Sequence, residues 1–140
     1  MTPEPDPSTL RILVADDNRD TATSMALLLE AAGFSVVAVA HDGRGAFDAI
    51  QRLRPKAAIL DIVLPDLDGY EIAKLVRKLP APRPKLIAVS GLARTCDRLD
   101  ALEAGFHAHF TKPVEWPKLQ SLLLAYAALP EADAQADPRD

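Results

Sequence analysis

Short apolar segments alternate with segments of helical periodicity five times along this chain, and this alternation limits the folds that it can adopt. The apolar segments are Arg11–Ala15, Ser35–Ala40, Ala57–Leu60, Lys85–Ser90 and Ala108–Phe110. The first four are continuous and rich in Val, Ile and Leu, as expected for strands buried on both faces of a parallel sheet. The repeated order of strand and helix predicts an α/β fold, a doubly wound (βα)5 sandwich around a five-stranded parallel sheet.

The segments between these strands place apolar residues at positions i, i+3, i+4 and i+7, which form one face of a helix. Three sets show this spacing: Met25, Leu28, Leu29 and Ala32; Ile72, Leu75, Val76 and Leu79; Leu119, Leu122, Leu123 and Tyr126. Two further helices are predicted over Gly43–Arg54, begun by Asp42, and over Thr95–Ala104, ended by Gly105.

The alternating segments predict one domain over residues 10–129. The chain of 140 residues and 15.1 kDa has the size of a single domain. Residues 1–9 carry three prolines and no periodicity, so we expect a flexible N-terminal arm. Residues 130–140 are acidic and poor in apolar side chains, which predicts a flexible tail and leaves no room for a second domain in this chain.

Composition excludes several classes of protein. No apolar run approaches the roughly 20 residues that span a bilayer, and the N-terminus lacks the features of a signal peptide. The single cysteine suits a reducing compartment, so we expect a cytoplasmic protein with no membrane partner. A net charge of −4 and few aromatic residues disfavour direct binding of nucleic acid.

Polar side chains stand where the predicted strands end. Asp16 and Asp17 follow the first strand, Asp61 the third, Ser90 and Gly91 end the fourth, and Lys112 and Pro113 follow the fifth. The carboxyl ends of parallel strands meet at one edge of the sheet, where ligands bind. Three carboxylates placed together need a compensating charge, which Mg²⁺ supplies, and a nearby hydroxyl and ammonium suit a phosphoryl group.

The individual residues also allow simpler interpretations. Asp16 and Asp17 could cap the helix that follows them, which is a common use of Asp. Ser90 and Lys112 carry little information alone. Asp61 is harder to explain structurally, because a carboxylate at the end of a central buried strand is costly unless it is paired. The ordered set as a whole favours a functional site.

The same residues resemble the receiver domain of bacterial two-component response regulators, from about Arg11 to Leu129. The matching motifs are ILVADDN at the first strand, LDIVLPDLDGYE around the third, AVSG at the fourth and FTKP after the fifth. The resemblance implies a flavodoxin-like strand order 2-1-3-4-5. It also implies that the chain is either a single-domain receiver or the receiver of a hybrid kinase.

The resemblance implies a role for each matching position. Asp61 corresponds to the phosphoacceptor, and Asp16, Asp17, Asp61 and the backbone carbonyl of Val63 correspond to the ligands of Mg²⁺, with Mn²⁺ as an alternative ion. Ser90 corresponds to the switch hydroxyl, Lys112 to the phosphoryl-binding lysine and Pro113 to a proline preceded by a cis peptide bond. Gly91, which has no side chain, would leave room for the phosphoryl group.

One position departs from the family pattern, and two others are expected to influence the lifetime of the phosphoryl group. His109 occupies the position of a switch residue that is usually Tyr or Phe, so we expect coupling through this position to be weakened or to depend on pH. Val63 and Leu92 correspond to positions that influence hydrolysis of the phosphoryl group. Both are apolar and cannot orient an attacking water, so we expect a phosphoryl group of relatively long lifetime.

The expected function is phosphorelay signalling. A histidine kinase or histidine phosphotransfer protein would supply the phosphoryl group, and the phosphorylated chain would bind a downstream protein that the sequence does not identify. Catalysis would be limited to self-directed phosphotransfer and autodephosphorylation. The alternative is a small phosphatase of the haloacid dehalogenase type with an aspartate nucleophile, although that class carries a second aspartate where this chain has Asn18.

Overall fold

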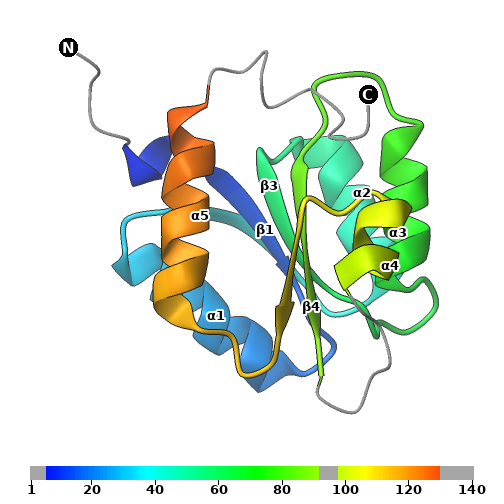
Figure 1. Ribbon diagram of the computed structural model, residues 1–140, viewed down its shortest axis with the longest axis horizontal. Coiled ribbons are helices and arrows are strands. Elements are labelled where there is room, and N and C mark those ends of the chain that lie inside the picture. The colour runs from blue at the N-terminus through cyan, green and yellow to red at the C-terminus, as the bar shows by residue number, and fades with distance from the viewer. Residues whose placement is uncertain (1–5, 92–97, 130–140) are drawn as a thin grey trace.

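A five-stranded parallel sheet forms the centre of the molecule, with helices on both faces (Figure 1). The computed structural model describes residues 6–91 and 98–129. The strands are β1 (Arg11–Ala15), β2 (Ser35–Ala40), β3 (Ala57–Asp61), β4 (Lys85–Ser90) and β5 (Ala108–Thr111). The helices are α1 (Arg19–Ala31), α2 (Gly43–Leu53), α3 (Gly69–Arg77), α4 (Arg98–Ala104) and α5 (Trp116–Ala128). The predicted alternation and fold class are therefore confirmed.

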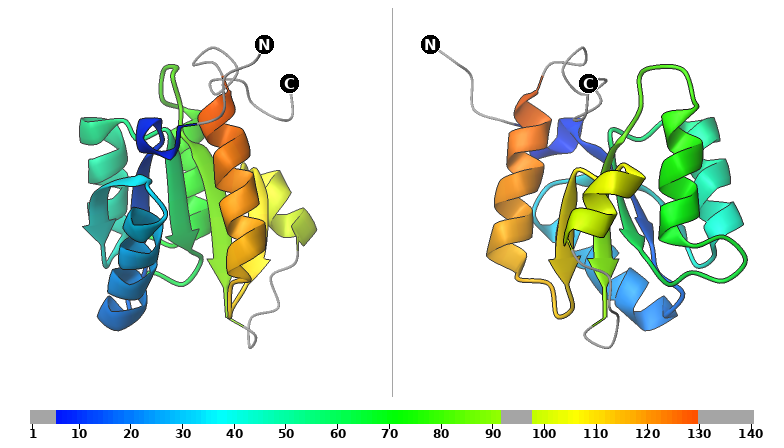
Figure 2. Two further views of the ribbon diagram at one scale, coloured as in Figure 1. Left: turned by 90° about the vertical axis from the view of Figure 1, so that its left-hand side faces the viewer. Right: turned by 45° about the vertical axis from the view of Figure 1, so that its right-hand side comes forward.

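The strand order is β2-β1-β3-β4-β5. After β2 the chain therefore crosses to the other side of β1, where β3, β4 and β5 follow one another. All four strand pairs are parallel. Helices α1 and α5 cover one face, and α2, α3 and α4 cover the other (Figures 1 and 2). This order confirms the flavodoxin-like arrangement, and it makes β1 and β3 adjacent, which brings Asp16 and Asp61 to neighbouring positions.

Alternate residues of the central strands face two separate cores. In β3, Ala58 and Leu60 pack with α2, α3 and α4, whereas Ala57 and Ile59 pack with α1 and α5. Every residue of β3 is consequently buried, which explains why its sequence shows no alternation of polar and apolar residues.

One burial prediction is wrong. The Ser35–Ala40 segment was expected to be buried on both faces, yet most of β2 is only half-buried and Val39 is exposed. The reason is position, because β2 forms an edge of the sheet and has a neighbouring strand on one side alone. An apolar run thus indicates a strand without revealing whether the strand is central.

Side-chain caps define where the helices begin. Asp42 caps α2, as predicted, and its carboxylate accepts a 2.6 Å hydrogen bond from the backbone N–H of Gly45. Asp68 and Glu71 form a capping box at the start of α3. The predicted start of the fourth helix at Thr95 lies outside the described residues, and α4 is seen from Arg98 to Ala104.

Part of the expected N-terminal arm is ordered. Residues Pro7–Thr9 form a short 3₁₀ helix capped by Asp6, and the Ser35 hydroxyl donates a 2.8 Å hydrogen bond to the carbonyl of Ser8. Residues 1–5 and 130–140 lie outside the described part of the chain. The flexibility of the two flanking segments therefore stays a prediction. Within residues 6–91 and 98–129, no helix has the length and apolar character needed to cross a bilayer.

Candidate functional site

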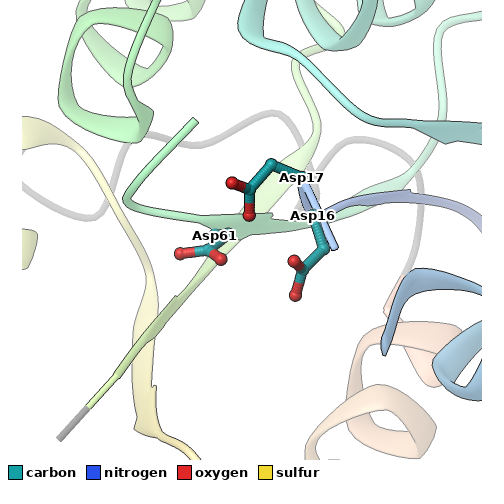
Figure 3. Close-up of side chains that lie close together, drawn as sticks. All are labelled: Asp16, Asp17 and Asp61. Atoms are coloured by element: carbon teal, nitrogen blue, oxygen red, sulfur yellow. The ribbon is translucent and has the colours of Figure 1, made fainter. Parts of the chain in front are cut away.

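Three carboxylates meet at the carboxyl edge of the sheet. Asp61 is the last residue of β3, and Asp16 and Asp17 directly follow β1. Their side chains point toward a common space (Figure 3), and one carboxylate oxygen from each lies within 4.8 Å of the others. Asp16 and Asp61 are buried at 6% and 5% exposure, whereas Asp17 is exposed. The site therefore opens to solvent on the side of Asp17.

Lys112 joins the two buried carboxylates. Its Nζ atom donates hydrogen bonds to Oδ2 of Asp16 and to Oδ2 of Asp61, both at 3.0 Å. The backbone N–H of Lys112 also donates to the carbonyl of Ser90 at 2.7 Å, which ties the segment after β5 to the end of β4. A positive charge is thus held where two negative charges would otherwise repel each other.

Backbone amides satisfy the other oxygen of each buried carboxylate. Oδ1 of Asp61 accepts a 3.0 Å hydrogen bond from the N–H of Val63, and Oδ1 of Asp16 accepts a 2.9 Å bond from the N–H of Asn18. These bonds fix the orientation of both side chains. They also leave the carboxylates facing the space that they share with Asp17 and Lys112.

The capping interpretation of Asp16 and Asp17 does not hold. The residue that caps α1 is Asn18, whose side-chain oxygen accepts a 3.0 Å hydrogen bond from the N–H of Thr21. Because Asn18 satisfies the exposed amide of the first helical turn, neither aspartate is needed there. Both carboxylates remain available at the edge of the sheet.

The charges perturb one another. Burial raises the pKa of Asp61 above its ordinary value, more strongly than the hydrogen bonds from Lys112 and Val63 lower it. Burial would lower the pKa of Lys112, but its hydrogen bonds to Asp16 and Asp61 outweigh that effect, and its pKa is raised. Lys112 is therefore a fixed cation, and Asp61 is a carboxylate whose charge is incompletely compensated by its surroundings.

Ser90 and His109 contact each other across β4 and β5. Ser90 is buried at 2% exposure, and its Oγ atom lies 2.8 Å from Nε2 of His109, which is half-buried. Neither the motif nor its spacing revealed this contact. A Cβ atom built on the neighbouring Gly91 would meet no atom of residues 6–91 or 98–129 within 4 Å, so these residues leave space beside it.

The remaining predicted positions flank the cluster. Val63 follows Asp61 by two residues and is 43% exposed. The Lys112–Pro113 peptide bond is cis. Leu92, the second position expected to influence hydrolysis, lies outside the described residues.

The loop after β3 is fastened to the start of α2, which the sequence did not reveal. Asp66, with a positive φ of 64°, accepts a 3.0 Å hydrogen bond at Oδ1 from the N–H of Gly43. The N–H of Gly43 also donates to the carbonyl of Pro65 at 3.2 Å. At Gly43 a Cβ atom would lie 1.8 Å from the carbonyl oxygen of Leu67, so only glycine fits. These contacts fix the loop that follows Asp61 and contains Val63.

An apolar cavity of about 430 Å³ opens beside Asp61, between α1 and the segment after β5. Met25, Leu28 and Val114 contribute apolar walls, and Asp16, Asp61 and Lys112 contribute its polar side. A group bound at Asp61 would therefore have an apolar surface next to it.

The carboxylate cluster has the chemistry of a site for a hard divalent cation. Carboxylate oxygens are the ligands that Mg²⁺ prefers, and three such groups from two strands converge within 4.8 Å. Two of the three are buried, and Lys112 supplies a single positive charge, so negative charge remains for a divalent cation to offset. The residues present fit a magnesium ion.

The comparisons with known proteins agree with this arrangement. The sequence matches the response regulator receiver domain over residues 12–124, and the chain belongs to that family. Receiver domains of response regulators act in phosphorelay signalling and receive phosphoryl groups from histidine kinases. The haloacid dehalogenase alternative is not favoured.

Two relatives show how far the similarity extends. The uncharacterized 14.6 kDa protein in the sodA1 3′ region of Leptolyngbya boryana is 36% identical over 124 residues, which cover 88% of this chain and 94% of that protein. The response regulator MprA of Mycobacterium avium is 36% identical over 132 residues, covering 91% of this chain and 56% of MprA. The chain thus spans about half the length of the MprA relatives.

Two solved structures share the fold. The receiver domain of the sensor histidine kinase PA1611 from Pseudomonas aeruginosa, solved with a magnesium ion in its active site cleft, is 30% identical with a TM-score of 0.75. That likeness covers 86% of this chain and 98% of the PA1611 chain. The receiver domain of the Francisella response regulator 1452 is 27% identical, with a TM-score of 0.76 and coverage of 84% and 96%.

Proposed function

We propose that this chain is a receiver domain that accepts a phosphoryl group on Asp61. The observation that carries the proposal is the placement of Asp61, which ends a fully buried central strand beside Lys112 and two further carboxylates. The Asp61 carboxylate can act as a nucleophile toward phosphorus, and Lys112 is placed to offset the roughly 1.5–2 negative charges that a phosphoryl group would bring to this position.

The proposed transfer uses the chain's own residues in defined roles. A carboxylate oxygen of Asp61 attacks the phosphorus of a phosphohistidine, the new P–O bond forms as the P–N bond breaks, and the electron pair returns to the donor's imidazole nitrogen. Lys112 offers a fixed positive charge to the phosphoryl oxygens. The Ser90 hydroxyl donates a hydrogen bond to the same group once it is attached.

We propose that Asp16, Asp17, Asp61 and the carbonyl of Val63 hold Mg²⁺, with Mn²⁺ able to replace it. A bound divalent ion neutralises charge that develops on phosphoryl oxygens. The protein's own contribution is to orient these ligands, which the amides of Asn18 and Val63 do through their hydrogen bonds to Asp16 and Asp61.

The proposed partners are a histidine kinase or histidine phosphotransfer protein and a downstream protein that distinguishes the phosphorylated state, all in the bacterial cytoplasm. No turnover of an external substrate is proposed. The chain would catalyse its own phosphorylation and dephosphorylation, and its output would be a change in protein binding.

The proposal is tested by stoichiometric phosphorylation. Incubation with a small-molecule phosphodonor and Mg²⁺ should add one phosphoryl group per chain, measured by intact mass spectrometry. Asp61→Asn should abolish the addition, while Asp48→Asn on the exposed face of α2 should retain it. Labelling that persists in Asp61→Asn, or repeated turnover of a phosphate ester, would contradict the proposal.

We also propose that the apolar side chain of Val63 lengthens the life of the phosphoryl group. Val63 stands exposed beside Asp61 and offers no atom that could orient an attacking water. Val63→Asn should shorten the half-life of the phosphorylated form, followed by mass spectrometry after removal of the donor. An unchanged half-life would assign the control of hydrolysis to other positions.

A further inference from the structure

The Ser90 hydroxyl is the third buried polar side chain of the site, after Asp16 and Asp61. Unlike the two carboxylates, it takes its hydrogen bond from β5. Among the described residues its side-chain partner is His109, with Oγ and Nε2 separated by 2.8 Å. The resting protein therefore satisfies this hydroxyl away from Asp61.

The register of the strands explains the contact. Ser90 pairs with Thr111, and His109 precedes Thr111 by two residues. Side chains two apart along a strand share a face, so the imidazole of His109 lies on the same face of β5 as Thr111 and reaches along the strand to Ser90. The long, planar side chain makes a contact that a smaller residue at position 109 would not make.

A serine hydroxyl carries one proton to donate. In the tautomer of His109 that carries its proton on Nδ1, Nε2 accepts the proton of the Ser90 hydroxyl. The hydroxyl cannot then donate to a phosphoryl oxygen on Asp61. The two hydrogen bonds compete for one proton.

We propose that His109 is a positioning residue that holds the Ser90 hydroxyl in the unphosphorylated protein and releases it when a phosphoryl group occupies Asp61. This inference rests on the proposed function, and it gives His109 a defined chemical role in the switch. The half-buried imidazole borders a groove between α4 and α5, with Glu115 and Lys118 among its lining residues, so water can reach this side of β5 after release.

The hydrogen bond between Ser90 and His109 is proposed for the unphosphorylated protein alone, and this predicts the effect of removing it. His109→Phe keeps an aromatic ring but leaves the buried Ser90 hydroxyl without its partner in the free protein. The bound state is spared, because the hydroxyl then donates to the phosphoryl group. A net hydrogen bond corresponds to roughly a threefold to tenfold change in an equilibrium constant, so His109→Phe should tighten binding by about that factor.

The test measures the affinity for beryllium fluoride, a phosphoryl mimic, in the presence of Mg²⁺ by isothermal titration calorimetry. The proteins are wild type, His109→Phe, Ser90→Ala and the double variant. We expect tighter binding in His109→Phe and no effect of His109→Phe in the Ser90→Ala background. His109→Gln, whose amide oxygen can accept from the hydroxyl, should stay close to wild type and provides a folded comparison.

The outcomes separate the two proposals. An unchanged affinity in His109→Phe, or an equal change with and without Ser90, overturns the role of His109 while the proposed function stands. A wild-type protein that does not bind beryllium fluoride overturns the proposed function, and the role of His109 with it. If His109 were purely structural, replacing it would lower the thermal stability of both the free and the bound protein and leave the affinity unchanged.

A spectroscopic measurement checks the tautomer of His109 that the proposal requires. In ¹⁵N-labelled protein, Nε2 of His109 should have the chemical shift of an unprotonated nitrogen that accepts a hydrogen bond. This shift should change when beryllium fluoride binds. A protonated Nε2 in the free protein would contradict the competition between the two hydrogen bonds.

Discussion

At the scale of single residues, Asp61 carries a buried negative charge that its surroundings compensate incompletely. Its carboxylate is buried, receives hydrogen bonds from Lys112 and Val63, and still has a raised pKa. The cost of this buried charge should be visible in the stability of the metal-free protein.

We predict that Asp61→Asn stabilises the metal-free protein at neutral pH. Because the folded state binds the Asp61 proton more tightly than the unfolded state, wild-type stability falls as pH rises from the unfolded value of 3.8 through the raised folded pKa. Asparagine does not titrate, so the advantage of Asp61→Asn should grow over that window and then level off.

Urea unfolding in EDTA at a series of pH values measures this difference. Asp48→Asn, at an exposed residue paired with Arg52, serves as the control and should show a small effect throughout. An advantage of Asp61→Asn that does not vary with pH would show that ionisation of the carboxylate is not the cause.

The sequence could identify this site because its members are fixed by the backbone. Asp16, Asp61 and Ser90 end strands or directly follow them, so the parallel topology alone brings them together. The contact between Ser90 and His109 and the hydrogen bond from the imidazole of His41 to the Asp16 carbonyl were not predictable in this way. Both depend on strand register and on side-chain rotamers, which residue patterns do not encode.

At the scale of secondary-structure elements, the sequence reveals type more readily than environment. Alternating apolar and periodic segments identified every strand, yet β2 proved half-buried because strand order decides which strand lies at the edge. Caps were predictable where one residue type has a strong local preference, as at Asp42. The contact between the loop after β3 and α2 joins residues far apart in sequence and required the structure.

We predict that Gly43→Ala destabilises the protein by at least about 2 kcal/mol, as expected for a steric conflict in a packed region. The added Cβ atom would lie 1.8 Å from the carbonyl oxygen of Leu67, so α2 or the loop after β3 must move. Chemical denaturation measures the change. Gly91→Ala is the matched control, because a Cβ atom there meets no described atom within 4 Å; equal losses in both variants would contradict the steric explanation.

At the scale of the whole molecule, the site exists only when the sheet is assembled. Asp16 and Asp17 come from one end of the chain and Asp61 from its middle, and the pairing of β1 with β3 holds them together. A cation that needs all three carboxylates therefore binds the folded chain and not the unfolded one.

We predict that Mg²⁺ raises the free energy of unfolding by about 1.4 kcal/mol at a free concentration of ten times its Kd, as mass action requires. Asp17→Asn should shift the dependence to higher Mg²⁺ concentration, because it removes one exposed ligand without disturbing the bonds of Lys112 to Asp16 and Asp61. Thermal unfolding across a magnesium titration measures both effects. Equal titration curves for the two proteins would exclude Asp17 from the metal site.

The attachment of the loop after β3 to α2 also has a kinetic consequence. The N–H of Gly43 donates to Pro65 and to Asp66, so its hydrogen exchanges with solvent only when that loop separates from the helix. Because Gly43 lies outside the carboxylate cluster, the exchange rate of this one amide records how often the loop after β3 opens, without any label at Asp61 itself.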